Sequence, residues 1–272
     1  MIRNDLVKFH QTWFKPGNAT LIVVGDTTLT EIKPRLEKLF KVWQGGKVPA
    51  KKIAAVALVP KSVVYIMDKP DAPQSMVICG HPAPSSADPE NIAIETMNAI
   101  LGGDFVSRIN MNIREDKHWS YGAQSALIDA RGQRPFLVFA PVQSDKTKET
   151  MVEIKGELEG ILGKKPITPD EYNTVKTSKV LQLPGQWETM DAVEGSLTGI
   201  VQFGLPDDYY QKYPARVQKL SLEDLAKAAK ATIHPESVIW VVVGDRAKIE
   251  PKIRELGFAE IHVIDGDGNI IK

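Results

Sequence analysis

The sequence predicts an α+β fold, in which helices pack on one face of an antiparallel or mixed β-sheet. Two observations indicate this class. Most of the strand-like segments lie between residues 63 and 142, whereas residues 146–220 carry mainly helical patterns. Strands and helices therefore do not alternate regularly, as they would in a doubly wound parallel sheet.

The individual elements follow from periodicity and from residues that begin or end a helix. We expect strands at residues 63–67, 76–80, 121–129 and 135–142. We expect helices at residues 89–101, 104–117, 146–162, 188–203 and 207–220, the second with Asp104 as its N-cap. A further helix should begin after Thr168, because Pro169 suits the first helical position and Glu171 completes a capping box.

A helix, a strand and a second helix recur at the two ends of the chain. At a constant offset of 219 residues, the matched positions are Asp5 with Asp224, Leu6 with Leu225, Lys8 with Lys227, Pro16 with Pro235, and Val23-Val24-Gly25-Asp26 with Val242-Val243-Gly244-Asp245. After a two-residue gap, Ile32, Pro34, Leu36 and Leu39 fall opposite Ile249, Pro251, Ile253 and Leu256. The repeat predicts a strand at residues 19–24 in the first copy and at 238–243 in the second.

This repeat sets the expected domain boundaries. Residues 1–46 would be the C-terminal tail of a preceding homologous domain, which has lost its beginning. Residues 47–60, rich in Lys, Pro and Ala, would form a linker. Residues 61–272 would form a complete second domain with its own copy of the repeated unit.

Composition excludes several classes of protein. Apolar residues make up 43% of the chain and charged residues 25%, as in ordinary globular domains. The 34 basic and 34 acidic residues cancel, so no overall field attracts nucleic acid, which we do not expect as a partner. Cys79 is the only cysteine, which excludes an internal disulfide. No apolar run approaches the ~18 residues of a membrane span.

The common catalytic motifs are absent from the sequence. No two of the five histidines lie at i and i+4, so no helix presents a pair of imidazoles to zinc, and we expect no metal site in this chain. The sequence also lacks the Gly-x-Ser-x-Gly elbow of hydrolases, a P-loop and a Gly-x-Gly-x-x-Gly fingerprint. The sequence therefore gives no support to a serine hydrolase or to a nucleotide-binding protein.

One segment carries a family resemblance. Residues 101–123 contain Leu101-Gly102-Gly103, Ser107-Arg108-Ile109, Ile113-Arg114-Glu115 and Tyr121-Gly122. This order resembles the Leu-Gly-Gly…Ser-Arg-Leu…Leu-Arg-Glu…Tyr-Gly stretch of the insulinase/pitrilysin family of zinc metallopeptidases. Residues 5–26 resemble the end of a neighbouring domain in that family. The resemblance implies the family's LuxS/metallohydrolase-like α+β domain.

The resemblance also implies a substrate-holding role. In that family, four homologous domains form two halves, on one chain or two, and one domain carries His-x-x-Glu-His and a distant Glu as the zinc site. An arginine and a tyrosine seven residues later, in the other half, complete the site. Arg114 and Tyr121 have this separation. A guanidinium and a phenol could hold backbone carbonyls of a peptide and stabilise the negative charge that develops during attack.

The chain is therefore expected to be the substrate-clamping part of a zinc endopeptidase, and to be inactive alone. Zinc would belong to the complete enzyme, its ligands lying on a homologous half in the same polypeptide or in a partner subunit, and the substrate would be a peptide. The resemblance implies a periplasmic location, with the cytoplasm as the alternative. A second hypothesis is a non-catalytic assembly subunit, similar to the family's core proteins of a respiratory complex. The Arg114 and Tyr121 pair favours the peptidase.

Overall fold

The computed structural model describes residues 1–257 and 259–271, which fall into two compact units. One unit contains residues 1–54 and 182–209. The other contains residues 55–181 and the chain from residue 210 onward. In the described ranges, none of the helices has the length and apolar character that crossing a bilayer requires.

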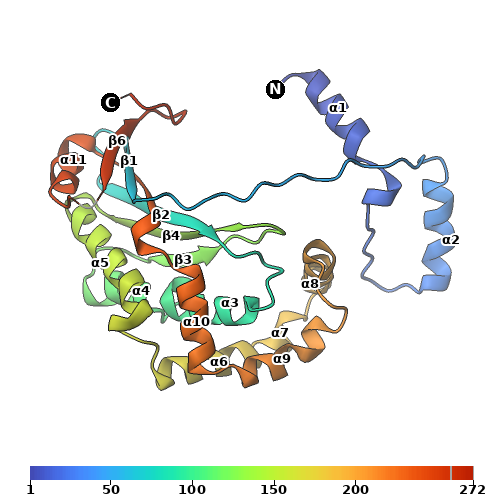
Figure 1. Cartoon of the computed structure of the whole chain (residues 1–272). Coiled ribbons are helices and arrows are strands. Elements are labelled where there is room, and N and C mark those ends of the chain that lie inside the picture. Colours follow the sequence, from blue (N-terminus) through green and yellow to red (C-terminus); the bar gives the residue numbers. More distant parts are fainter. Residues whose placement is uncertain (258, 272) are drawn as a thin grey trace. The chain divides into compact units, whose positions relative to one another are not determined.

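The second unit is built on a six-stranded mixed sheet (Figure 1), which confirms the predicted α+β class. Its strand order is β3-β4-β2-β5-β1-β6. The strands are β1 (Val63–Asp68), β2 (Gln74–Ala83), β3 (Gln124–Leu127), β4 (Arg134–Gln143), β5 (Ile239–Gly244) and β6 (Glu260–Ile264). β1 runs parallel to β5 and β6, and the remaining pairs are antiparallel. Sequence reasoning missed β6, and it extended the strand at 121–129 beyond the four residues of β3.

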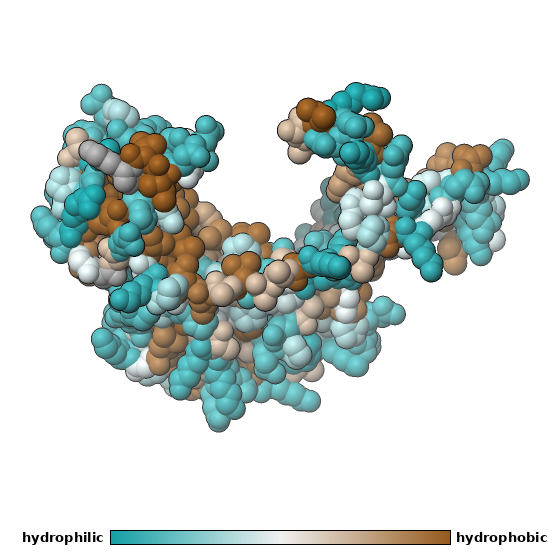
Figure 2. Space-filling model, turned by 45° about the horizontal axis from the view of Figure 1, so that its top comes forward, coloured by the Kyte–Doolittle hydropathy of each residue, from teal (hydrophilic) through white to brown (hydrophobic). Residues whose placement is uncertain are grey.

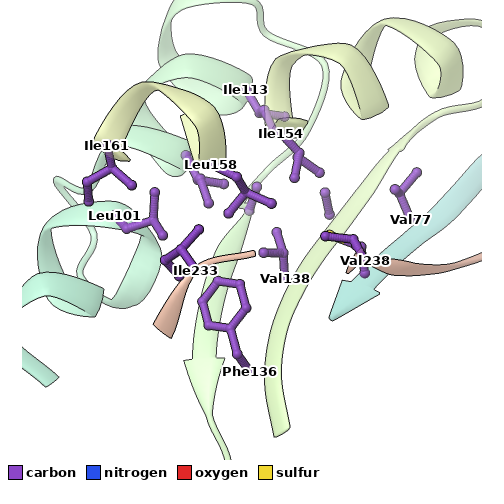
Figure 3. Packing of buried hydrophobic residues seen from close by; sticks show 14 of the residues in the cluster. Val77, Leu101, Ile113, Phe136, Val138, Ile154, Leu158, Ile161, Ile233 and Val238 are labelled. Carbon is purple, nitrogen blue, oxygen red and sulfur yellow. The ribbon is translucent and has the colours of Figure 1, made fainter. Parts of the chain in front are cut away.

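Helices pack on one face of this sheet (Figure 1). They include α3 (Asn91–Asn98), α5 (Thr147–Glu159), α10 (Leu222–Thr232) and α11 (Arg246–Arg254). Two more helices, α6 (Pro169–Leu181) and α9 (Tyr209–Lys219), lie farther from the sheet, beyond α3 and α10 (Figure 1). Apolar side chains from the strands and helices meet in one core (Figure 3), where Phe136 and Val138 of β4 lie near Leu158 of α5. All three side chains are fully buried, each contributing about 1.5–3 kcal/mol to folding.

The helix predicted from Asp104 has a different form. Asp104 does not cap it, because Asp104 follows the π-helix η2 (Ala99–Gly103), and the short helix α4 (Arg108–Asn110) begins only after Ser107. A second π-helix, η3 (Met111–Asp116), continues α4. The helix expected at residues 89–101 is likewise shared between α3 and η2. The loose turns of π-helices depend on packing, which local propensity does not describe.

The helix start at Thr168 agrees with the sequence. The Thr168 hydroxyl accepts a hydrogen bond from the Glu171 amide at 3.2 Å, and the Glu171 carboxylate accepts one from the Thr168 amide at 2.8 Å. These reciprocal bonds form the predicted capping box at the beginning of α6.

In the described part of the first unit, Leu183 is the one buried apolar side chain, so this unit has no extensive core of its own. It contains α1 (Arg3–Trp13), η1 (Pro16–Asn18), α2 (Leu29–Phe40), α7 (Leu183–Gln186) and α8 (Met190–Phe203). None of α1, α2 and α8 has a buried residue, and apolar side chains are visible on the surface of the N-terminal segment (Figure 2). The predicted strand at residues 19–24 is wrong for this chain: no strand in the described ranges pairs with it, and a β-ladder needs a neighbour.

The end of the predicted linker is held to the second unit by one side chain. The Gln133 amide accepts a hydrogen bond from the Val56 backbone amide at 2.6 Å and donates one to the Val56 carbonyl at 3.2 Å. The Gln133 side chain thus imitates a strand residue, satisfying both backbone groups of Val56.

Candidate functional site

Arg114 lies on the π-helix η3, with about a third of its side chain exposed. Its guanidinium stands over the ring of Phe105, with its central carbon 4.4 Å from the ring centroid. Its Nη1 atom lies 3.4 Å from Oε1 of the neighbouring Glu115 but makes no hydrogen bond with any described residue. Nη1 is buried and unpaired, so Arg114 can offer a donor to a ligand only from the exposed part of its guanidinium.

Arg108, six residues earlier, is an arginine whose contacts are structural. Its Nε and Nη2 atoms donate to the two carboxylate oxygens of Glu171 at 2.6 and 2.7 Å. Nη1 and Nη2 also donate to the carbonyls of Lys165 and Pro166. Every nitrogen of Arg108 is occupied, so this side chain fixes α4 to the start of α6.

Tyr121 lies in the turn before β3, with 92% of its surface exposed. Within the described chain, no hydrogen bond engages its hydroxyl. The turn itself is well fixed, because the Ser120 hydroxyl accepts a bond from the Gly122 amide at 3.1 Å and donates to the Pro141 carbonyl of β4. A rigid turn thus presents a free phenol donor to the surroundings.

A buried asparagine joins the segments that carry Phe105 and Tyr121. Asn110 donates a hydrogen bond to the Phe105 carbonyl at 2.6 Å and accepts one from the Ala123 amide at 3.1 Å. The amide group of Asn110 is thereby satisfied on both sides. The bond to Ala123 fixes the chain two residues beyond Tyr121.

These segments border one hollow of about 600 Å³. Tyr121 and Phe105 are in its wall, and Arg114 packs against the Phe105 ring. No direct contact between Arg114 and Tyr121 is found. The other lining residues combine apolar side chains with the Gly-Gly turn and the start of the edge strand: Met76, Gly102, Gly103, Asp104, Asn110, Gly122, Ala123, Gln124, Phe139 and Pro141. Tyr121 thus lines the hollow, whereas Arg114 is not part of its wall and reaches it only through its contact with Phe105.

The sequence profile of the peptidase M16 inactive domain matches residues 1–179, well over half of the chain. This chain belongs to the peptidase M16 family. The finding agrees with the insulinase-type resemblance of residues 101–123. Among curated protein sequences, none matches the chain significantly.

Solved structures show the M16 fold as well. The peptidase M16 inactive domain from Pseudomonas fluorescens is 21% identical with a TM-score of 0.79, and the match covers 90% of this chain and 58% of that one. A protease from Helicobacter pylori is 20% identical, with a TM-score of 0.78 and coverages of 90% and 59%. The periplasmic protease PqqL from Escherichia coli is 14% identical, with a TM-score of 0.67, and the match covers all of this chain and 32% of that one. This chain thus spans less than two thirds of each.

The residues of this M16 domain do not fit a metal site. Nowhere in residues 1–257 and 259–271 do three His, Cys, Asp or Glu side chains lie close enough to hold a metal ion. Cys79, a ligand type that zinc favours, is buried in the core, and burial raises the pKa of its thiol far above the usual range. The described residues therefore provide no set of ligands for a zinc ion.

Two residues of the site escaped sequence reasoning. Phe105 follows a Gly-Gly turn and resembles an ordinary helix residue in the sequence, and Asn110 occupies a polar position between apolar ones. The only feature of the sequence that could have pointed to Phe105 is an aromatic residue nine positions before Arg114, in a segment between two helices. Asn110 acts through contacts thirteen residues away, which no local pattern encodes.

Proposed function

We propose that this chain is the substrate-clamping part of an M16 zinc endopeptidase, and that Arg114 and Tyr121 hold backbone carbonyls of a peptide. One observation carries the proposal. Tyr121 keeps a free hydroxyl in the wall of the hollow, and Arg114, which packs against Phe105 of the same wall, makes no hydrogen bond with any described residue. A purely structural arginine, such as Arg108, has its donors occupied.

The chemistry of the two side chains suits this role. A guanidinium stays charged at every physiological pH, and a phenol donates without carrying a charge of its own. When a peptide carbonyl is attacked, negative charge grows on its oxygen, and fixed donors stabilise that charge without reorganising. In the complete enzyme, zinc on another domain would supply the activated water. This chain would hold and orient the peptide.

The second part of the proposal concerns the zinc ligands, which would lie outside this chain. Because the described residues contain no group that could hold zinc, the chain alone should not cleave peptides. Its partner would be a homologous half with the His-x-x-Glu-His motif, in the same polypeptide or in another subunit. We further propose a periplasmic location, which the description of PqqL as periplasmic supports.

We also propose that residues 1–46 end a preceding domain of the same fold, that residues 47–60 are a linker and that residues 61–272 form one M16 domain. The support is the repeat at offset 219 together with exposure. α1 and α2 have no buried residues, whereas their counterparts α10 and α11 contribute Leu225 and Ile249 to the core. A sheet domain that accepts residues 19–24 as a strand would bury the apolar faces of the first copy.

The clamp is tested by mixing this chain with its zinc-bearing half and measuring cleavage of fluorescence-quenched peptides. Arg114→Ala and Tyr121→Phe should each lower kcat/KM by at least about tenfold, equivalent to about 1.4 kcal/mol of transition-state stabilisation. Arg131→Ala, at an exposed arginine, and Tyr65→Phe, which removes a hydroxyl elsewhere, are the matched controls.

Association of the two halves is measured in parallel for every variant. Normal cleavage by both Arg114→Ala and Tyr121→Phe would reject the clamp and favour the assembly subunit. Loss of cleavage together with loss of association would assign the two residues to the interface between halves.

A further inference from the structure

We infer that Phe105 is a positioning residue, whose ring restrains the Arg114 guanidinium beside the hollow and leaves the exposed part of that guanidinium to bind a peptide. The inference rests on the proposed function and adds to it a residue that neither the family match nor the motif containing Arg114 and Tyr121 identifies. It is carried by the exposure of Phe105, by the stacking of Arg114 and by the way the Phe105 turn is fixed.

Phe105 is unusual for a phenylalanine in this unit. About two thirds of its surface is exposed, whereas Phe136 of β4 is completely buried. Its ring adds nothing to the hydrophobic core, since Phe105 is absent from the core cluster. The contacts it does make are with the hollow, which it lines, and with the guanidinium of Arg114.

The stacking geometry favours binding by Arg114. A guanidinium is planar and donates its hydrogen bonds within its plane, so an aromatic ring against one face restrains the side chain without occupying a donor. A carboxylate partner would instead consume the donors, as Glu171 does for Arg108. The one carboxylate near Arg114, that of Glu115, lies at 3.4 Å from Nη1 without a hydrogen bond. Nη1 is buried, but about a third of the side chain stays exposed, and among the described residues the ring is the main contact that restrains it.

The Phe105 turn is itself held on two sides. Asn110 binds the Phe105 carbonyl and the Ala123 amide, so it ties this turn to the segment after Tyr121. Gly102, just before the turn, lies directly against β3: a Cβ at this position would stand 2.4 Å from the Ser125 hydroxyl. Only glycine permits this approach, so the Gly102-Gly103 end of η2 places Phe105 at a fixed distance from the edge strand β3.

These contacts form a chain of support. β3 and Asn110 fix the turn, the turn fixes the Phe105 ring, and the ring restrains the guanidinium of Arg114. Asn110 links the same turn to the segment of Tyr121. The relative position of the two proposed peptide donors is thus set by Phe105 and Asn110, although Arg114 and Tyr121 do not touch.

The test compares Phe105→Leu with Phe105→Tyr in the complete enzyme, assembled with its zinc-bearing half. Leucine keeps an apolar side chain but removes the ring, so kcat/KM should fall roughly three- to tenfold. Tyrosine keeps the ring face and should restore at least half of the wild-type value. Val106→Ala, at the exposed neighbouring position, is the control and should leave turnover unchanged.

A double-mutant comparison separates positioning from a direct contact with substrate. If Phe105 acts through Arg114, Phe105→Leu should cause no further loss in an Arg114→Ala background. A full additional loss there would overturn the inference, and so would normal turnover by Phe105→Leu in an enzyme that Arg114→Ala inactivates. In that second case the clamp itself would stand.

A spectroscopic measurement tests the stacking without any activity. In the free chain, the ring current of Phe105 should shift the side-chain proton resonances of Arg114 upfield. The shift should vanish in Phe105→Leu and persist in Phe105→Tyr. Its absence from the wild type would overturn the inference. A clear shift combined with full activity of Arg114→Ala would instead reject the clamp, and with it the positioning role.

Discussion

Leu6 and Leu225 occupy matching positions in the two copies of the repeated unit, yet 56% of Leu6 is exposed and Leu225 is completely buried. The same holds for the strand positions, where Val23 is 46% exposed and Val242 is buried. The residues are the same in both pairs. The difference comes from the surroundings that each copy finds within this chain.

In the second copy, β5 lies between two other strands. Val242 is opposite Ile66 of β1 on one side and Val77 of β2 on the other, and all three side chains are completely buried. In the first copy, residues 19–24 have no neighbouring strand in the described ranges. Both copies still form their helices, because helical hydrogen bonds are local, whereas a strand requires partners from elsewhere.

The largest expected effect separates the two valines. Val242→Asp would bury a carboxylate between Ile66 and Val77 without a partner, and should lower the free energy of unfolding by more than about 4 kcal/mol. Val23→Asp should change it by less than about 0.5 kcal/mol, because that side chain is already exposed. Urea-induced unfolding of both variants measures the contrast.

The same pair sharpens the domain proposal. In a longer protein that contains the preceding domain, Val23→Asp should become as damaging as Val242→Asp. Equal and large losses in the present chain would mean that Val23 already lies in a packed environment, which would contradict the comparison. A mild loss at both positions in the longer protein would contradict the proposed preceding domain.

A pH-dependent effect of intermediate size depends on a contact found only in the second copy. The His234 amide donates a hydrogen bond to Nε2 of His81 on β2, whereas the amide of Lys15, the matching residue, bonds locally to the Trp13 carbonyl. Burial of His81, opposed by its hydrogen bond to the Pro82 carbonyl and helped by the nearby His234, lowers the pKa of its imidazole to about 4.

The sign follows from the unfolded state, in which the pKa of the His81 imidazole returns to about 6.5. As the pH falls from about 6.5 to 4, the His81 imidazole becomes protonated in the unfolded chain but stays neutral in the folded chain. The free energy of unfolding should therefore fall by roughly 3 kcal/mol. Urea unfolding across this range measures the slope. His81→Gln should flatten it, while His10→Gln, at an exposed histidine of the first copy, should leave it unchanged.

The smallest expected effect concerns the helix starts. Ser221 caps α10 by accepting a hydrogen bond from the Asp224 amide, and hydrogen bonds from Ser221 hold the pKa of the Asp224 carboxyl below its usual range. The matching residue before α1 is Ile2, which has no side chain able to cap. Ser221→Ala should lower the free energy of unfolding by about 1 kcal/mol.

Ile2→Ser supplies the converse substitution. It should raise the helix content of residues 3–13, seen by circular dichroism on a peptide of that segment, without changing the unfolding of the sheet unit. Similar stability losses from Ser221→Ala and gains from Ile2→Ser in the whole chain would imply that both copies belong to one cooperative core.

The parts of the fold that sequence reasoning predicted are those fixed by local chemistry. The capping box at Thr168 and Glu171 is an example, since all its hydrogen bonds lie within four residues. The π-helix that carries Arg114 and the edge strand β6 were missed, because packing decides both. Tyr121 lines the hollow and Arg114 contacts Phe105 of its wall, and the peptide-binding role of both residues stays a prediction. The proposed role of Phe105 depends on the contact between its ring and the Arg114 guanidinium, which the sequence alone does not predict.

The attachment of Val56 to Gln133 has a consequence for how closely the N-terminal segment is tethered. By composition, a flexible connection would extend from residue 47 to residue 60. Because Gln133 pairs with both backbone groups of Val56, the tether ends before residue 56 rather than at residue 60. A shorter tether raises the effective concentration of one end near the other. Gln133→Ala would therefore act as an insertion into the linker, although it adds no residue to the chain.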